Sequence, residues 1–273
     1  MGAVNVEAGS VGDAPSRPDW APGPARPVLG TATCDVWRID LEALAVAGGG
    51  DPENSPLDAA ERERARRFVF DRHRRWYTAA RTALRSIVGG YLGLEPAAVP
   101  IELEELGRPR LAPDGLPVAL REAHGAAGPL DFNLSHTDGL ALLAVAHGGP
   151  LGVDVEQLRE MNDAEALAKR FFAGDEIDRV LGSAGLARQR AFFLCWTRKE
   201  AVLKSTGVGL TVSTRSVHVG ATPESRTLDF RSKERVVPLV LHSFEVRDGA
   251  FGACAVAPAV TRLAFHDFGP GLG

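Results

Sequence analysis

The stretch CWTRKEAVLKSTG (195–207) ends a helical pattern that begins near Arg188. Trp196, Glu200 and Lys204 recur at intervals of four residues, so they share one face of the predicted helix. A glutamate followed by a lysine four residues later is an ordinary stabilising pair of an exposed helix, worth about 0.2–0.5 kcal/mol. The apolar run that precedes the pair instead favours a buried helix, whose glutamate and lysine would border a cleft.

Lysine is rare in this chain, because only four of its 31 basic residues are Lys. Lys199 and Lys204 both lie in the quoted stretch. A lysine ammonium is compact and mobile, and its pKa can shift, so it can transfer protons in a way that a guanidinium cannot. These properties favour a chemical role for Lys204. Lys199 lies off the face that carries Glu200, which indicates a structural role or a contact with a partner.

The stretch GVDVE (152–156) has the alternation of a strand. Asp154 and Glu156 would share one face, and Val153 and Val155 the other. Neighbouring carboxylates repel each other and need a cation or solvent between them. One interpretation is a site for a hard cation such as Mg²⁺, which prefers oxygen ligands. The other is an edge strand whose acidic face is solvated, as charged residues usually are.

Two further stretches could contact phosphate. NLSHTDG (133–139) resembles a loop at the end of a strand, from which Ser135 and His136 could donate hydrogen bonds to phosphate oxygens. An ordinary turn-forming cluster is the alternative. GRPRL (107–111) places Arg108 beside a proline, in a position typical of a rigid turn.

The region from residue 61 to 85 is strongly basic, although the chain as a whole is acidic. A local basic patch suits a polyphosphate or an acidic protein partner. The alternative is a solvated helix face, partly balanced by Glu61 and Glu63. The arginines of this region are Arg62, Arg64, Arg66, Arg67, Arg72, Arg74, Arg75, Arg81 and Arg85.

The overall composition is that of a soluble globular protein, with 273 residues, 45% hydrophobic and 24% charged. Its net charge of −4 argues against binding to nucleic acid. No apolar run approaches the ~18 residues of a membrane span. Three widely spaced cysteines suggest neither a disulfide framework nor a zinc site, and we therefore expect a cytoplasmic location.

The pattern of elements predicts an α+β fold in two similar halves. Residues 82–94 echo 201–210, with LRS against LKS, and DGLALLAVA echoes DGAFGACAVA. An internal duplication would give a pseudo-dimer whose ligand site lies in the cleft between the halves. We expect a disordered N-terminal extension, an N-terminal half, a C-terminal half and a flexible tail, spanning residues 1–31, 32–150, 151–262 and 263–273 respectively.

Local signals predict three helical stretches. Ser55 is a plausible N-cap, with Pro56 at the first helical position. A second helix starts near Asp71 and would end at Gly89 and Gly90. A helical stretch follows over 164–185.

The order GRPRL, FNLSHTDG, LGVDVEQL, AKRFFAGDE, WTRKEAVLKSTGVGL resembles the 4′-phosphopantetheinyl transferases. It is most similar to their single-chain, two-half type, which activates the surfactin synthetase, peptide synthetases and polyketide synthases. The resemblance runs from about residue 32 to about residue 258 and covers nearly all of the chain that we expect to be ordered.

The resemblance implies a site for Mg²⁺, with Mn²⁺ as a possible substitute, at Asp154, Glu156 and Glu200. It implies catalytic roles for Asp154, Glu200 and Lys204. Glu200 would be a metal ligand or a base acting through water. Lys204 would contact the pyrophosphate or protonate the leaving oxygen.

The resemblance also implies coenzyme A as the donor substrate. Ser135 and His136 match the motif that holds its phosphates, Arg108 matches a basic residue near the nucleotide, and Arg64 matches one near the 3′-phosphate. The chain departs from the family at Glu61, where a basic residue is usual, and at Trp76, where an arginine is usual.

The implied reaction moves the phosphopantetheine arm of coenzyme A to a serine of an apo acyl or peptidyl carrier protein and releases 3′,5′-ADP. The implied partners are coenzyme A and the carrier, without nucleic acid or membrane, and the enzyme would be a monomer. The alternatives are a coenzyme A- or carrier-binding protein without turnover, and another Mg²⁺-dependent transferase that cleaves a pyrophosphate.

Overall fold

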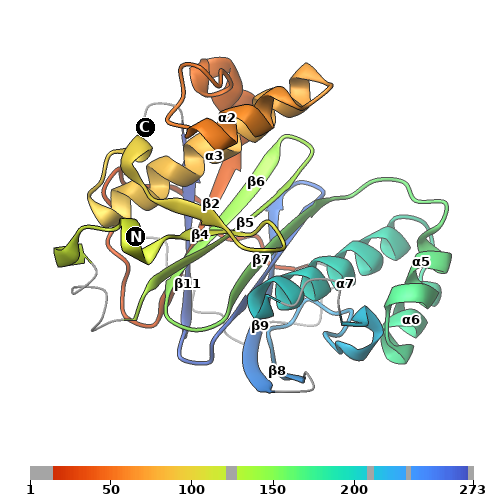
Figure 1. Cartoon of the computed structure of the whole chain (residues 1–273). Helices are drawn as coiled ribbons and strands as arrows, with labels where there is room; N and C mark the ends of the chain where they lie inside the picture. The colour runs from red at the N-terminus through yellow and green to blue at the C-terminus, as the bar shows by residue number, and fades with distance from the viewer. Residues whose placement is uncertain (1–14, 121–127, 208–211, 232–234, 270–273) are drawn as a thin grey trace. The chain divides into compact units, whose positions relative to one another are not determined.

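Two helices of 22 residues, each packed on its own sheet, organise the chain (Figure 1). The computed structural model describes residues 15–120, 128–207, 212–231 and 235–269. The described chain divides into two units. The first contains Trp20–Gly148 and residues 264–269, and the second contains residues 15–19 and Gly149–Leu263.

The first unit has a sheet in the order β1-β11-β2-β6-β5, and helix α3 packs on it. The strands are β1 (Ala21–Pro22), β2 (Thr33–Asp40), β5 (Leu130–Thr137), β6 (Leu140–His147) and β11 (Arg262–Phe268), with β3 (Ile101–Leu103) and β4 (Pro109–Leu111) forming a separate hairpin. The helices are α1 (Leu41–Leu44), α2 (Ala59–Arg66) and α3 (Asp71–Leu92), with shorter turns at η1 (Ala45–Gly49), η2 (Pro96–Ala98) and η3 (Pro113–Gly115). Ala83 and Ile87 of α3 share a core with Ile39, Phe132 and Leu143 of the sheet.

The helices of the first unit begin and end differently from the predictions. Helix α2 starts with Asp58, not Ser55, as its N-cap, because Asp58 and Glu61 form a reciprocal capping box. Helix α3 continues through Gly89 and Gly90 to a left-handed Gly93. A Cβ on Gly90 would lie 2.5 Å from the carbonyl oxygen of Ala25, so this glycine permits a close backbone contact and does not end the helix.

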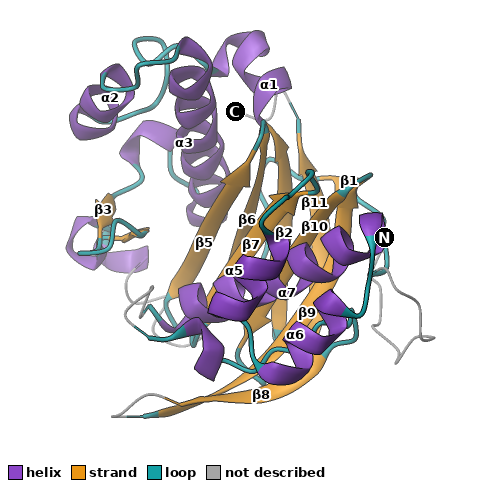
Figure 2. Cartoon of the chain, turned by 90° about the vertical axis from the view of Figure 1, so that its right-hand side faces the viewer, coloured by secondary structure: helices purple, strands orange, loops and turns teal. Residues whose placement is uncertain are grey.

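The second unit has an antiparallel sheet in the order β7-β10-β9-β8 (Figure 2). Its strands are β7 (Leu151–Gln157), β8 (Arg226–Arg231), β9 (Val236–Arg247) and β10 (Ala250–Val256). Its helices are α5 (Ala164–Phe171), α6 (Gly174–Leu181) and α7 (Gly185–Thr206), with a short turn η5 (Thr214–Ser216). Thus the stretch predicted as helical over 164–185 is broken at Phe172, which leaves α5 with extended backbone and is fully buried.

The two units repeat one arrangement. In each, a first strand precedes the long helix and two later strands follow, and the last strand lies between the other two: β2-β6-β5 and β7-β10-β9. Both middle strands follow an Asp-Gly turn, in which Gly139 and Gly249 have φ of 74° and 72°. Asp-Gly is a typical tight hairpin connection because its glycine adopts positive φ without strain. The predicted α+β fold with two similar halves is confirmed.

The predictions for the termini are wrong for the described residues. Residues 15–31 are not disordered: β1 pairs in parallel with β11, and the Trp20 ring packs edge-on against Phe265 at 5.1 Å. Residues 262–268 form β11, not a flexible tail, because Leu263 and Phe265 are buried. Residues 1–14 and 270–273 lie outside the described residues, and the boundary between the units falls after Gly148, two residues before the predicted one.

Two cations of α7 are structural. Lys199 is fully buried, 2.7 Å from the carboxylate of Glu176, and donates to the carbonyl oxygens of Thr214 and Val217. Its neighbour Arg198 donates two hydrogen bonds to the carbonyl oxygen of Val219. Both side chains therefore fix the segment after α7 onto the helix. This result decides between the two roles left open for Lys199 in favour of the structural one.

His242 of β9 predicts a loss of stability in acid. Burial, with a smaller effect of the Arg198 charge, lowers the pKa of His242 from 6.5 to about 4, and its Nδ1 lies 2.9 Å from the Ser225 hydroxyl. The unfolded chain therefore takes up a proton at a higher pH than the native state. The free energy of unfolding should fall as the pH drops from about 6.5 to about 4, by on the order of 2 kcal/mol.

Urea denaturation at a series of pH values tests this prediction. His242→Gln should flatten the dependence over this range, whereas His218→Gln, on an exposed side chain, should leave it unchanged. An unaltered slope in His242→Gln would contradict the assignment.

Candidate active site

Strand β7 and helix α7 approach each other closely at Gly152. A Cβ at this position would lie 2.1 Å from the carbonyl oxygen of Ala201 and 2.4 Å from the amide nitrogen of Ser205. Both atoms belong to the backbone of α7, so a side chain here would have to displace the helix. Gly152 therefore sets the separation between the strand that carries Asp154 and the helix that carries Glu200.

Gly152→Ala should lower the free energy of unfolding by at least about 1–3 kcal/mol, the usual cost of overpacking. The matched control is Gly174→Ala, because a Cβ at Gly174, the first residue of α6, would meet no atom within 4 Å. We expect the control to stay within about 1 kcal/mol of the wild type. Urea denaturation compares the two variants, and equal stabilities would show that β7 and α7 are not in this contact.

Three carboxylates and a lysine gather where β7 packs on α7. Asp154 is buried, and its Oδ1 accepts a hydrogen bond from Lys204 Nζ at 2.6 Å. Glu156 and Glu200 are half-buried, and Arg159 lies 3.1 Å from Glu156. Burial, and after it the charge of Asp154, raises the pKa of both glutamates. The structure thus brings these four predicted residues together, and Asp154 is not part of a solvated acidic face.

The chemistry of this group suits a hard divalent cation, since all of its potential ligand atoms are carboxylate oxygens. Burial is the main cause of the raised pKa values, and the charge of Asp154 adds to it; a bound cation would offset that second contribution. In the described part of the chain, however, no three His, Cys, Asp or Glu side chains already form a metal-holding group. Asp154 is instead turned toward Lys204. A bound cation would therefore have to compete with the lysine for this carboxylate.

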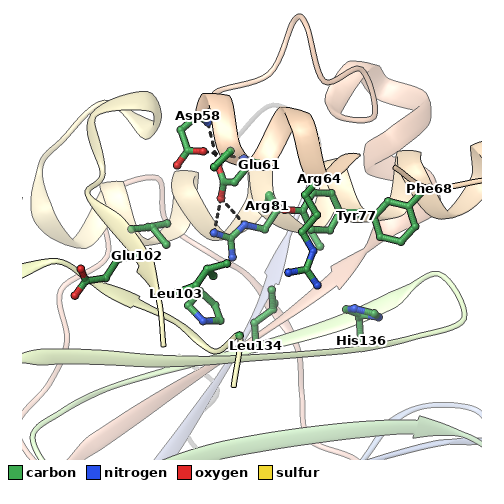
Figure 3. A pocket seen from close by; sticks show the side chains of 15 residues that line it. Asp58, Glu61, Arg64, Phe68, Tyr77, Arg81, Glu102, Leu103, Leu134 and His136 are labelled. Carbon is green, nitrogen blue, oxygen red and sulfur yellow. Dashed lines mark hydrogen bonds and ion pairs between the residues drawn. The ribbon is translucent and has the colours of Figure 1, made fainter. Parts of the chain in front are cut away.

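The first unit has a cavity of about 550 Å³ between α2, α3, the β3–β4 hairpin and β5 (Figure 3). Arg64, Tyr77, Arg81 and His136 line it. The Arg64 guanidinium lies 5.7 Å from the Tyr77 ring and makes no ion pair with any described residue. Its cationic group is therefore available to an anionic ligand.

The structure separates the other predicted coenzyme A contacts. Ser135 and His136 lie within β5 and not in a loop, so they point to opposite faces of the sheet. His136 is exposed and lines the cavity, whereas Ser135 is buried and does not. Arg108 is bound to Asp131 at 2.9 Å, and its neighbour Pro109 lines the cavity in its place.

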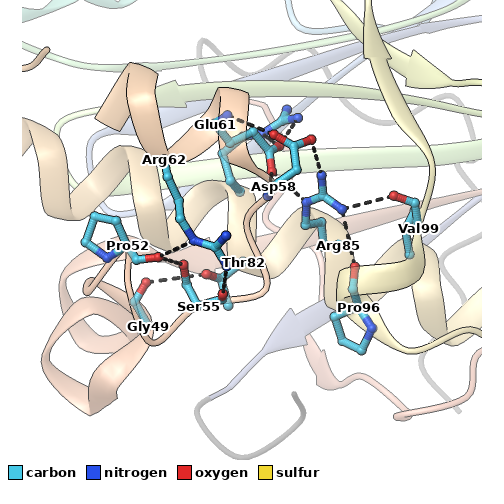
Figure 4. Close-up of polar contacts among 11 residues, drawn as sticks. Gly49, Pro52, Ser55, Asp58, Glu61, Arg62, Thr82, Arg85, Pro96 and Val99 are labelled. Carbon is cyan, nitrogen blue, oxygen red and sulfur yellow. Dashed lines mark hydrogen bonds and ion pairs between the residues drawn. The ribbon is translucent and has the colours of Figure 1, made fainter. Parts of the chain in front are cut away.

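The basic region is only partly a surface patch. Arg81 and Arg85 are buried, and both pair with Glu61; the first pair is drawn in Figure 3 and the second in Figure 4. Arg85 also binds Asp58 and the carbonyl oxygen of Val99. Glu61, which the resemblance implies to be a departure from a basic position, is thus the shared anion of a buried charge cluster. This part of α3 is therefore neither a solvated helix face nor part of a continuous basic surface patch.

Trp76, the second position at which the resemblance implies a departure, is held by a side chain of α1. Its Nε1 donates a hydrogen bond to Glu42 at 2.7 Å, and its ring lines a second cavity of about 290 Å³. Tyr77 and His136 line both cavities.

Comparison with known proteins gives the family. Residues 150–252 match the 4′-phosphopantetheinyl transferase superfamily, and residues 53–148 match the N-terminal domain of 4′-phosphopantetheinyl transferase. The chain is 39% identical to 4′-phosphopantetheinyl transferase HetI of Nostoc sp. over 210 residues, which are 75% of this chain and 81% of HetI. This chain belongs to the 4′-phosphopantetheinyl transferases.

Two further relatives carry the same function in their names. The transferase is 31% identical to the phosphopantetheinyl transferase of Thraustochytrium sp. over 190 residues, 63% of this chain and 62% of that one. It is 26% identical to 4′-phosphopantetheinyl transferase Sfp of Bacillus subtilis strain 168 over 216 residues, 74% and 89% of the two chains. The family and the enzyme class are confirmed, whereas the resemblance to the Sfp type rests on the lower identity.

Some residues of the transferase's site were missed from the sequence. Tyr77, Arg81 and Arg85 recur every four residues, which could have indicated one shared face of α3. Gly152 inside a strand could have indicated a close backbone approach.

No helix in the described ranges is long and apolar enough to cross a membrane.

Proposed function

We propose that this transferase moves the phosphopantetheine arm of coenzyme A to a serine of an apo acyl or peptidyl carrier protein, as a monomer and with Mg²⁺. The observation that supports this proposal is the gathering of Asp154, Glu156, Glu200 and Lys204 at the contact of β7 with α7. The serine oxygen bonds to the β-phosphorus while the bond from that phosphorus to 3′,5′-ADP breaks. The hydroxyl proton leaves the serine in the same step.

Asp154, Glu156 and Glu200 would hold the Mg²⁺, with Mn²⁺ as a substitute. When bound, the ion supplies positive charge to the pyrophosphate oxygens. Glu200 has a raised pKa, which suits it either to ligate or to accept the serine proton through a water. Lys204 Nζ donates a hydrogen bond to Asp154. If Asp154 bound the Mg²⁺ instead, Lys204 could direct this donor toward the leaving oxygen.

The nucleotide of coenzyme A would occupy the cavity of the first unit. Arg64 and His136 line this cavity and can donate to phosphate oxygens. Arg108 and Ser135 do not line the cavity, so they would only support its wall. Arg108 would do so through its bond to Asp131, and Ser135 from the buried face of β5.

A mass assay tests the function. The purified protein is incubated with coenzyme A, Mg²⁺ and several apo carrier proteins, and the carriers are weighed by mass spectrometry. We expect the mass of a phosphopantetheine group to be added only when Mg²⁺ is present. No addition on any carrier would refute the proposal. Coenzyme A binding by calorimetry without transfer would favour a binding protein, and cleavage of other pyrophosphates in a substrate panel would favour a different transferase.

A further inference from the structure

Three aromatic side chains follow one another along the first turns of α3. The rings of Phe70 and His73 lie 5.6 Å apart, and those of His73 and Trp76 lie 6.0 Å apart. Phe70, the N-cap of α3, is 67% exposed, and its neighbour Val69 is 90% exposed. The aromatic stripe (Phe70, His73 and Trp76) therefore presents apolar surface to solvent.

The aromatic stripe leads into the second cavity of the first unit. His73 and Trp76 line this cavity of about 290 Å³ together with Leu41 and Phe68. The Trp76 ring is held in the wall by its hydrogen bond to Glu42. An exposed apolar surface that ends in a pocket is typical of a protein docking site, because the residues that contribute most to association fill such pockets on the partner.

Arginines border the aromatic stripe. The Arg72 guanidinium lies 4.9 Å from the Trp76 ring, and Arg75 lies one turn further along α3. Neither makes an ion pair with a described residue, whereas Asp71, the one acidic residue between 66 and 75, is paired with Arg74. The flanking arginines (Arg72 and Arg75) therefore give this surface an excess of positive charge, although the chain has a net charge of −4.

The charge and the shape of this surface together favour an acidic protein as its partner. Carboxylates of such a partner would pair with the flanking arginines, and this complementarity would direct the encounter. An anionic lipid surface would also attract arginines, but a bilayer takes up protruding side chains and does not fill a cavity. The second cavity instead suits one apolar side chain of a folded partner.

We propose that the aromatic stripe, the second cavity and the flanking arginines form the surface on which the apo carrier protein docks. This inference rests on the proposed function. Tyr77 and His136 line both cavities, so a carrier on this surface lies beside the cavity proposed for coenzyme A (Figure 3). The surface selects carriers that present an exposed apolar side chain among carboxylates near the serine.

Phe70→Ala and Arg72→Glu test the proposal by transfer kinetics at saturating coenzyme A and a series of apo carrier concentrations. Each should raise the KM for the carrier by about 10-fold or more, as for the loss of an anchor residue or the reversal of an interfacial charge. Their kcat and their KM for coenzyme A should stay near the wild-type values, because neither residue lines the first cavity. Thermal melts show that both exposed substitutions leave the protein folded.

Matched controls come from exposed side chains elsewhere in the chain. Val46→Ala removes a side chain that is 71% exposed in η1, and Arg231→Glu reverses an exposed charge on β8 of the second unit. Both should leave the KM for the carrier unchanged. A carrier in which one carboxylate near the serine is replaced by lysine should lose affinity for the wild type and recover part of it with Arg72→Glu.

A binding measurement separates docking from turnover. Calorimetry without coenzyme A uses a carrier whose serine is replaced by alanine, and its dissociation constant should rise by about 10-fold or more in Phe70→Ala and Arg72→Glu. Equal effects in these variants and in the controls would overturn the inference. So would an unchanged carrier affinity in variants that lose binding to phosphatidylserine vesicles or lose self-association. The failure of the proposed function looks different, since the wild type would then transfer nothing in the mass assay.

Discussion

Lys199→Met is expected to lower the free energy of unfolding by about 3–5 kcal/mol, the usual cost of removing one partner of a buried ion pair. Lys199 and Glu176 are both fully buried and lie 2.7 Å apart. Methionine would leave the Glu176 carboxylate without its cation and would remove the donor to the carbonyl oxygens of Thr214 and Val217. Urea denaturation measures the loss, and circular dichroism shows whether the variant is folded at zero urea.

The chain offers a matched control in a second lysine–glutamate pair. Lys169 and Glu165 lie 2.6 Å apart on α5, with more than half of each side chain exposed. Lys169→Met should leave the free energy of unfolding nearly unchanged, because solvent already screens the pair. The double variant Lys199→Met, Glu176→Gln should recover part of the loss, since it removes the buried charge. Equal effects at Lys199 and Lys169 would contradict the assignment of Lys199 as a buried structural cation.

Under the proposed function, Asp154→Asn is expected to lower Mg²⁺-dependent transfer by at least about 100-fold, because it would remove a charged ligand of the proposed Mg²⁺ ion. The substitution keeps the size of a buried side chain, so the protein should stay folded. It also removes the charge that Lys204 contacts at 2.6 Å. The transfer rate is measured over a series of Mg²⁺ concentrations, and the half-saturating concentration should rise.

The control for this prediction is Glu160→Gln, an exposed carboxylate shortly after β7. It should leave both the rate and the Mg²⁺ dependence unchanged. A thermal melt of each variant separates unfolding from lost chemistry. Full activity in a folded Asp154→Asn protein would show that β7 does not hold the metal.

The sequence predicted the elements well where a pattern is local. Alternation in GVDVE is enough to place Asp154 and Glu156 on one face of a strand, because a strand has a fixed period of two. The four-residue spacing of Glu200 and Lys204 likewise places them on one face of α7. Boundaries were less certain, because Gly90 is an internal helix residue only through its contact with Ala25, far away in the sequence.

The order of motifs along the chain determined the family of this protein, and the periodicity of its strands and helices determined the two-half α+β fold. Tertiary structure alone decided what each charge does. The sequence left Lys199 between a structural role and a partner contact, and it placed Arg81 in a basic region. In the structure they form buried pairs with Glu176 and Glu61, which lie 23 and 20 residues before them. Removing a charge from water costs free energy, and only a partner of opposite charge close in space offsets that cost. Periodicity along the chain does not specify which residue this partner is.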